Sequence, residues 1–194
     1  MDGLQFFQKS AGQWYSLRTT HHLPFRRAET GGSDINVESL GADDQRIAEI
    51  CEMHSVDPNQ AVGGAFVSWD GAMAWDKEGE DHSGTSVFSL VPDQENPQQG
   101  KLLRERGYAE VVPVMGEYHI DQEDALVLVT EYDTMSINER FWFPHPSLRL
   151  RTSTVKRFGG LSTATFCAEI RVDNADGTTS ETTEQDSVQS LWGW

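Results

Sequence analysis

Apolar and polar residues alternate with a period of two along much of this chain, a pattern that predicts β-strands. A first strand starts at Gln13, a second covers residues 34–40, and turn residues separate the later strands. The gaps are of hairpin length, so the pattern favours an antiparallel meander or barrel over alternating strands and helices. The seven later strands are expected at 63–75, 85–91, 108–119, 125–133, 136–143, 148–157 and 162–172.

Two segments have helical periodicity instead. Residues 2–11 are expected to form a short N-terminal helix that ends at Gly12 and buries Leu4, Phe6 and Phe7. The principal helix is expected after the second strand, over residues 43–54, where two aspartates at the start suit a helix N-terminus. Its buried positions, at spacings i, i+3, i+4 and i+7, are Ile47, Ile50, Cys51 and His54.

The composition narrows the class of protein. The 194 residues include 15 Lys and Arg against 31 Asp and Glu, which gives a formal net charge of −16. This balance argues against a nucleic-acid-binding protein and against a polybasic membrane-surface protein, because both need a basic surface. No apolar run is long enough to span a membrane and no secretory signal is visible, so a cytoplasmic protein is expected. The two cysteines, Cys51 and Cys167, fit a reducing compartment.

The length predicts one folded domain. We expect residues 1–172 to form a single barrel domain. Residues 173–190 hold five acidic residues, seven Ser or Thr and no basic residue. Such a composition cannot bury enough apolar surface to order itself, so 173–194 is expected to be a disordered tail.

The order Gly12-Gln13-Trp14, placed where a short helix leads into the first strand, is typical of calycins such as lipocalins. In that fold the tryptophan closes one end of the barrel and an arginine from a late strand covers it. Arg171, on the last expected strand, is a candidate for that arginine. The predicted fold is therefore a mainly β, calycin-like antiparallel barrel of about ten strands, which is wide enough to hold one small ligand.

One expected strand, over 148–157, is unusually basic. Its alternation places Arg149, Arg151 and Ser153 on one face and two leucines, Leu148 and Leu150, on the other. Arginines at i and i+2 stand about 6–7 Å apart along a strand, which suits two neighbouring carboxylates of a ligand. The same pattern also fits a strand whose leucines face the core and whose arginines are solvated.

Two carboxylates lie among apolar neighbours, Glu139 beside Ile137 and Glu169 beside Cys167. A carboxylate on an inward face must be paired or have its pKa raised, so each is a candidate catalytic group or a structural ion-pair partner. Met73 and Trp75 share a strand face, which fits either ordinary core or the wall of a site for a flat aromatic ligand.

Motifs of conventional enzymes are absent from the sequence. His21 and His22 alternate faces, and no Cys/His cluster has zinc spacing, so no metal site is predicted. There is no nucleophile elbow, P-loop or dinucleotide-binding fingerprint either. The sequence therefore predicts neither a metal nor a bound cofactor.

Several blocks of the sequence resemble the S-type phycobiliprotein lyases of cyanobacteria. They include Leu-Arg-Leu-Arg-Thr-Ser-Thr-Val-Lys-Arg at 148–157 and Phe-Cys-Ala-Glu-Ile-Arg at 166–171. The segment 144–147, Pro-His-Pro-Ser, differs from the Asn-rich version associated with that family. The other matching blocks lie at 4–14, 16–23, 73–76, 102–110 and 138–143.

The resemblance implies a ten-stranded barrel that binds an open-chain tetrapyrrole such as phycocyanobilin. It implies transfer of this bilin to a cysteine of an apo-phycobiliprotein, with the β-subunit as the expected acceptor, through a thioether bond. It also implies roles for individual residues, with the bilin as substrate rather than cofactor. Glu139 and Glu169 would face the pyrrole nitrogens, and the expected bilin-binding residues are Arg149, Arg151, Ser153, Met73, Trp75 and Arg18.

Alternatives to a self-sufficient lyase remain open. The same barrel could carry a bilin without transferring it, or it could be one subunit of a heteromeric lyase. The resemblance also implies a homodimer. Both cysteines are expected to be packing residues, because the nucleophile would belong to the acceptor protein.

Overall fold

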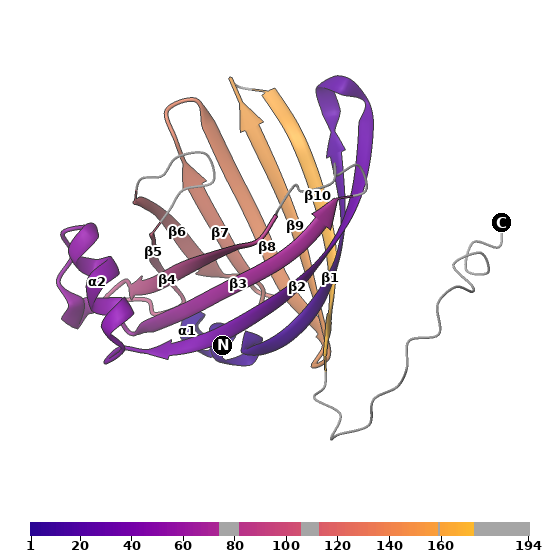
Figure 1. Ribbon diagram of the computed structural model, residues 1–194. Coiled ribbons are helices and arrows are strands. Elements are labelled where there is room, and N and C mark those ends of the chain that lie inside the picture. Colours follow the sequence, from indigo (N-terminus) through magenta and orange to yellow (C-terminus); the bar gives the residue numbers. More distant parts are fainter. Residues whose placement is uncertain (74–81, 106–112, 159, 173–194) are drawn as a thin grey trace, which may run out of the picture.

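The computed structural model describes residues 1–73, 82–105, 113–158 and 160–172. Ten antiparallel strands form a closed barrel in which each strand pairs with its chain neighbours and β1 pairs with β10 (Figure 1). The expected calycin-like barrel is therefore confirmed. The strands are β1 (Gly12–His22), β2 (Arg27–Gly41), β3 (Gly63–Met73), β4 (Gly84–Pro92), β5 (Gln99–Arg104), β6 (Val114–Ile120), β7 (Leu126–Glu131), β8 (Met135–His145), β9 (Leu148–Arg157) and β10 (Gly160–Arg171).

The short N-terminal helix α1 (Gly3–Ser10) lies across one end of the barrel, at the bottom of Figure 1. Asp2 and Gln5 form a capping box, so the helix begins where two otherwise unpaired backbone N–H groups are satisfied. Phe6 and Phe7 are buried among apolar side chains of the barrel interior, whereas Leu4 is only partly buried. The helix therefore closes this end of the barrel.

The second helix, α2 (Gln45–Met53), packs on the outside of the barrel against β4 and β5. Asp44 caps its N-terminus and accepts a hydrogen bond from the backbone N–H of Arg46. The apolar side expected from the sequence is confirmed except at His54, which caps the helix and hydrogen-bonds the carbonyl oxygen of Arg104. The buried residues between α2 and the barrel are Leu40, Ile47, Ile50, Cys51, Ala61, Val91 and Leu103.

Three details of the predicted strands were wrong. The strand β5 was missed, because its sequence, Gln-Gly-Lys-Leu-Leu-Arg, contains no β-branched or aromatic residue. The strand expected at 108–119 is β6, which begins at Val114; residues 106–112 lie outside the described part. The strand expected at 34–40 begins at Arg27, since the polar, Gly-rich stretch before Asp34 pairs with β1 as well.

The turn expected at 144–146 also differs. β8 continues through Pro144 to His145, with an irregularity in its pairing to β9 after Trp142. Proline has no backbone N–H to donate, so it is tolerated where regular pairing is interrupted.

The barrel interior is divided along its length. Next to α1 it is filled by apolar side chains, among them Trp14, Leu102 and Tyr118. Further along β1 and β5, toward the other end, inward positions are polar or charged, at Ser16 and Arg104. The polar site therefore adjoins the apolar part of the interior, which lies next to α1.

Candidate functional site

The two arginines of β9 face the interior of the barrel. Arg149 is buried, and Arg151 follows two residues later on the same face. The alternative of solvated arginines over a leucine core is wrong, because Leu148 and Leu150 alternate with them and face outward. Charged side chains therefore occupy the inside of this wall, and apolar side chains occupy its outside.

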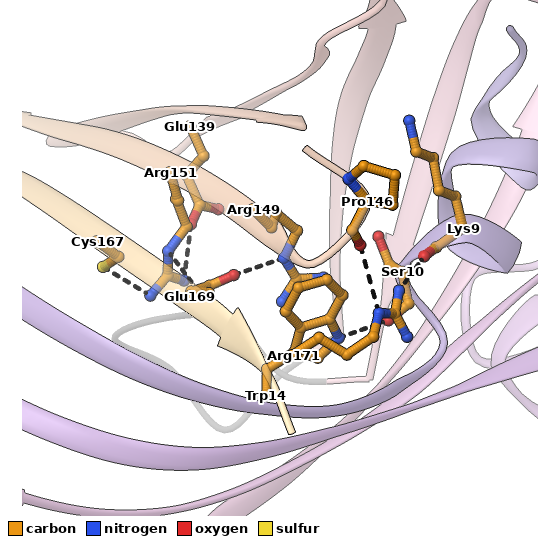
Figure 2. A network of polar contacts seen from close by, with 10 residues as sticks. All are labelled: Lys9, Ser10, Trp14, Glu139, Pro146, Arg149, Arg151, Cys167, Glu169 and Arg171. Atoms are coloured by element: carbon orange, nitrogen blue, oxygen red, sulfur yellow. Dashed lines mark hydrogen bonds and ion pairs between the residues drawn. The ribbon is translucent and has the colours of Figure 1, made fainter. Parts of the chain in front are cut away.

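Two glutamates complete a buried network with these arginines (Figure 2). Arg149 Nε donates to Glu169 Oε2 at 2.5 Å, and Arg151 Nε lies 3.7 Å from Glu169 Oε1. Arg151 Nη1 lies 3.9 Å from Glu139 Oε1, so it links the two carboxylates. Arg151 Nη2 also contacts Cys167 Sγ at 3.2 Å. The arginines and glutamates singled out in the sequence are thus brought together.

A third arginine belongs to the network and was missed. Arg104, at the end of β5, is buried and donates from Nη2 to Glu139 Oε2 at 3.0 Å. Its guanidinium also lies 5.1 Å from the centre of the Phe88 ring. The sequence did contain a signal, since Arg104 follows a pair of leucines in one of the blocks that resemble the lyases. Because the strand β5 was not predicted, the sequence could not show that the Arg104 side chain points into the barrel.

The expected cover on the barrel-end tryptophan is confirmed. The guanidinium of Arg171 lies 4.2 Å from the Trp14 ring centre and donates to the backbone oxygens of Ala11 and Lys9, at 2.6 and 2.8 Å. Trp14 Nε1 donates to Ser10 O at 2.8 Å. The guanidinium of Arg149 lies 4.9 Å from the centre of the same ring. Trp14 therefore connects the closed end of the barrel to the charged network.

Arg18 and Ser153 lie on the same inner surface. Arg18 of β1 pairs across from Cys167 of β10, which in turn pairs with Arg151. Ser153 pairs across from Glu139 on one side and from Thr165 on the other. Met73 ends β3 opposite Gly31, and Trp75 lies outside the described residues, so their expected role as a pocket wall stays a prediction.

A pocket of about 600 Å³ opens at the end of the barrel away from α1. Its described lining residues are His22, Phe25, Arg27 and Glu29, from the hairpin between β1 and β2. His22 Nε2 lies 3.3 Å from Glu29 Oε2 across the hairpin. Along β1 the inner face runs from Trp14, through Arg18, to His22 at this mouth, so the charged network lies between the closed end and the pocket.

Among the described residues, three guanidinium groups and two carboxylates meet in this network, and Arg18 lies on the same inner surface. Burial lowers the pKa of Arg149, while the nearby charge of Glu169 opposes this shift. Such a site favours a ligand that brings carboxylates for the arginines and N–H donors for the glutamates.

The described residues contain no group of three or more His, Cys, Asp or Glu side chains placed to hold a metal ion. None of their helices has the length and apolar character needed to cross a bilayer. Cys51 and Cys167 are buried, in keeping with packing roles.

The sequence matches the family model described as CpeS-like protein over residues 2–172. It is 63% identical to "Chromophore lyase CpcS/CpeS 2" of Synechocystis sp., and the alignment covers both chains completely. It is 61% identical to "Phycocyanobilin lyase subunit CpcS" of Picosynechococcus sp., over the whole chain and 98% of that protein.

A solved structure agrees with these matches. The S-type phycobiliprotein lyase CPES from Guillardia theta superposes with a TM-score of 0.77 at 35% identity, over 89% of this chain and 94% of that one. Sequence and structure lead to the same conclusion: the chain belongs to the CpeS-like family.

Proposed function

We propose that this protein is a chromophore lyase that binds an open-chain tetrapyrrole and transfers it to a cysteine of an apo-phycobiliprotein. The observation that carries the proposal is the buried network of three arginines and two glutamates inside the barrel. A bilin has two propionate groups and four pyrrole-type nitrogens, so it complements both kinds of charge. Similar proteins are named chromophore lyases, and one is named a phycocyanobilin lyase subunit.

In this proposal Arg149 and Arg151 bind the propionates, with Ser153 beside them and Arg18 as a further contact. The two arginines contribute differently. Arg149 is almost completely buried against Glu169 and Trp14, so it is mainly a fixed part of the wall. The Arg151 side chain is 26% exposed and its ion-pair distances are longer, so an entering carboxylate can reach it.

Glu139 and Glu169 are proposed to accept hydrogen bonds from the pyrrole nitrogens. Oε1 of Glu169 is buried and accepts no hydrogen bond from the described residues. A buried acceptor without a donor costs stability, and a bilin N–H would remove that cost. Carboxylates next to the ring nitrogens also favour the protonated bilin, which is more readily attacked by a thiol. Met73 and Trp75 are proposed to contact the flat ring system.

The covalent step is an addition. The acceptor's sulfur attacks the ethylidene carbon of the bilin, a C–S bond forms, and the thiol proton ends on the tetrapyrrole. No group leaves and nothing is oxidised or reduced, so the reaction needs no cofactor. The lyase contributes by holding the ethylidene group in one orientation, which is an effect of proximity. The nucleophile comes from the acceptor, so Cys51 and Cys167 have no covalent role.

The specific substrates follow from the resemblance: phycocyanobilin as the bilin and the phycobiliprotein β-subunit as the acceptor. A related function is that of one subunit in a heteromeric lyase, because the Picosynechococcus relative is named a subunit. A test of the purified chain alone separates the two.

We also propose a homodimer through the outer wall of β9, β10 and β1. Across residues 148–154, 164–172 and 13–19 no outward-facing side chain is charged, although the chain has a net charge of −16. Leu17, Phe166 and Ile170 are exposed on this wall. An exposed apolar surface of several strands is typical of a protein interface.

The function is tested by mixing the purified protein with phycocyanobilin, with and without apo-phycocyanin β-subunit. The expected result is a red-shifted complex, followed by an adduct on the β-subunit that survives denaturation and fluoresces with zinc. A complex without an adduct would identify a carrier or a missing partner subunit. The absence of any complex would refute the proposal.

A further inference from the structure

The end of the barrel opposite α1 has an unusual rim. Two hairpins meet there, because the end of β1 pairs with the start of β10 and the 3-10 helix η1 (Leu23–Phe25) contacts β10. Large apolar side chains at these hairpins are exposed to solvent, with Phe158 87% exposed and Leu161 51% exposed. The rim patch, as we define it, consists of Leu23, Phe25, Arg26, Arg27, Lys156, Arg157, Phe158 and Leu161.

The rim patch is positively charged in a strongly acidic protein. Residues 21–29 and 155–163 together contain four Arg and Lys residues and one acidic residue, Glu29. The positive region has a boundary, since the neighbouring turn between β7 and β8 carries Glu131 and Asp133. That turn contacts the patch through the Phe158 backbone N–H, which donates to Thr134 O at 3.0 Å. An acidic protein surface would be attracted to the patch and repelled by the rest of the molecule.

The fold also limits where an acceptor protein can approach. At one end α1 closes the barrel, anchored by Arg171 and packed into the apolar core. The wall is continuous, because all ten strands are paired in a closed ring. The pocket at the rim includes His22, which lies on the same inner face of β1 as Arg18. We therefore expect an acceptor thiol to reach a bound bilin from this side.

Resting on the proposed function, we infer that the rim patch is the docking surface for the acceptor protein. The patch fits a partner that presents acidic side chains and an apolar contact around its acceptor cysteine. The aromatic and aliphatic side chains at the tips supply the desolvated contact, and the four cations supply attraction and orientation. Lys156, Phe158 and Leu161 lie outside the described pocket lining, so substitutions at these three positions separate docking from bilin binding.

The first test uses Phe158→Ser/Leu161→Ser, which removes apolar contact from the patch at positions outside the described pocket lining. The probes are phycocyanobilin, followed by absorption, and apo-phycocyanin β-subunit, followed by the initial rate of adduct formation. Bilin affinity is expected to stay within about twofold, while KM for the β-subunit rises by on the order of tenfold. The matched control is Met53→Ser/Met115→Ser, two exposed apolar residues outside the rim patch.

The second test changes charge and does not depend on the first variant. Lys156→Glu is expected to raise KM for the β-subunit at low salt, and the difference should shrink at high salt because exposed charges are screened. Lys101→Glu, on the outer wall of β5, makes the same change of charge and serves as control.

Transfer at the unmodified rate by both rim variants would overturn the inference, as would equal losses in the rim variants and their controls. Weakened bilin binding in the rim variants would also overturn it. Failure of the unmodified protein to bind bilin is a different result, which refutes the proposed function itself.

Discussion

Arg104 on β5 donates a 3.0 Å hydrogen bond to Glu139 on β8, and both side chains are buried inside the barrel. The two strands are not neighbours in the sheet, since β6 and β7 lie between them. The contact therefore joins separate parts of the wall through the interior. It also keeps the Glu139 carboxylate beside the two arginines of β9.

Removing Arg104 should destabilise the protein. Arg104→Met leaves Glu139 buried with one guanidinium fewer, which is expected to cost about 3–5 kcal/mol of the free energy of unfolding in urea. The double variant Arg104→Met/Glu139→Leu should recover part of this loss, because no unpaired carboxylate remains. As a control, Arg46→Met removes the exposed pair with Glu38 and should cost less. Equal losses for Arg46→Met and Arg104→Met would contradict this account of the network.

The two arginines of β9 should respond differently to substitution. Arg151→Ala is expected to weaken phycocyanobilin binding by at least about tenfold, the effect of losing one charge-assisted contact, with little change in stability. Arg149→Ala should lower the free energy of unfolding by about 3–5 kcal/mol, since Glu169 would lose its closest partner. Absorption titrations measure the first effect and urea unfolding the second. If both variants lost similar bilin affinity and similar stability, the assignment of Arg149 to the barrel wall and of Arg151 to ligand binding would be wrong.

Asp44 makes stability depend on pH. Its side-chain hydrogen bond with Arg46 lowers the pKa of Asp44 from 3.8 to about 2. The ionised form is thus favoured by folding, so its contribution is present above pH 3.8 and is lost as the pH falls toward about 2. Asp44→Asn keeps a capping side chain but cannot ionise. The difference in free energy of unfolding between the two proteins should therefore shrink from pH 5 to pH 2, and a constant difference would exclude this role.

Arg171 should hold α1 in place. Arg171→Met removes two charge-assisted hydrogen bonds to the backbone at the end of α1, with an expected loss of about 2 kcal/mol. Faster hydrogen exchange is expected at the amides of α1, with smaller changes in α2. The exposed Arg157→Met is the control. Uniform exchange changes across the barrel would show that Arg171 stabilises the whole fold rather than this end.

The outer wall of β1 and β10 should control self-association. Leu17→Lys/Ile170→Lys is expected to convert the proposed dimer to a monomer in sedimentation velocity experiments, because it places charge on an otherwise uncharged face. Met115→Lys, on β6, should leave the dimer intact. A monomeric unmodified protein at micromolar concentration would refute the dimer.

The sequence predicted the barrel, both helices and most strands, because period-two alternation and the aspartate caps are local signals. It could not orient β9. Arg149 and Leu150 alternate, and the usual rule would place the leucine inside, whereas β9 has its arginines inside and its leucines outside. Arg104 was missed because β5 is short and lacks β-branched residues. Its partner, Glu139, is 35 residues away, so no local pattern connects them.

The closed end formed by α1 has a kinetic consequence. Among the described residues the pocket is the way into the barrel, so the bilin and the acceptor share one route. With the acceptor docked on the rim patch as proposed, the bilin has to bind first. The reaction should then follow a compulsory order, with acceptor bound to the empty barrel as a dead-end complex. Excess acceptor would slow turnover by blocking reloading, and adding the bilin first would relieve the delay.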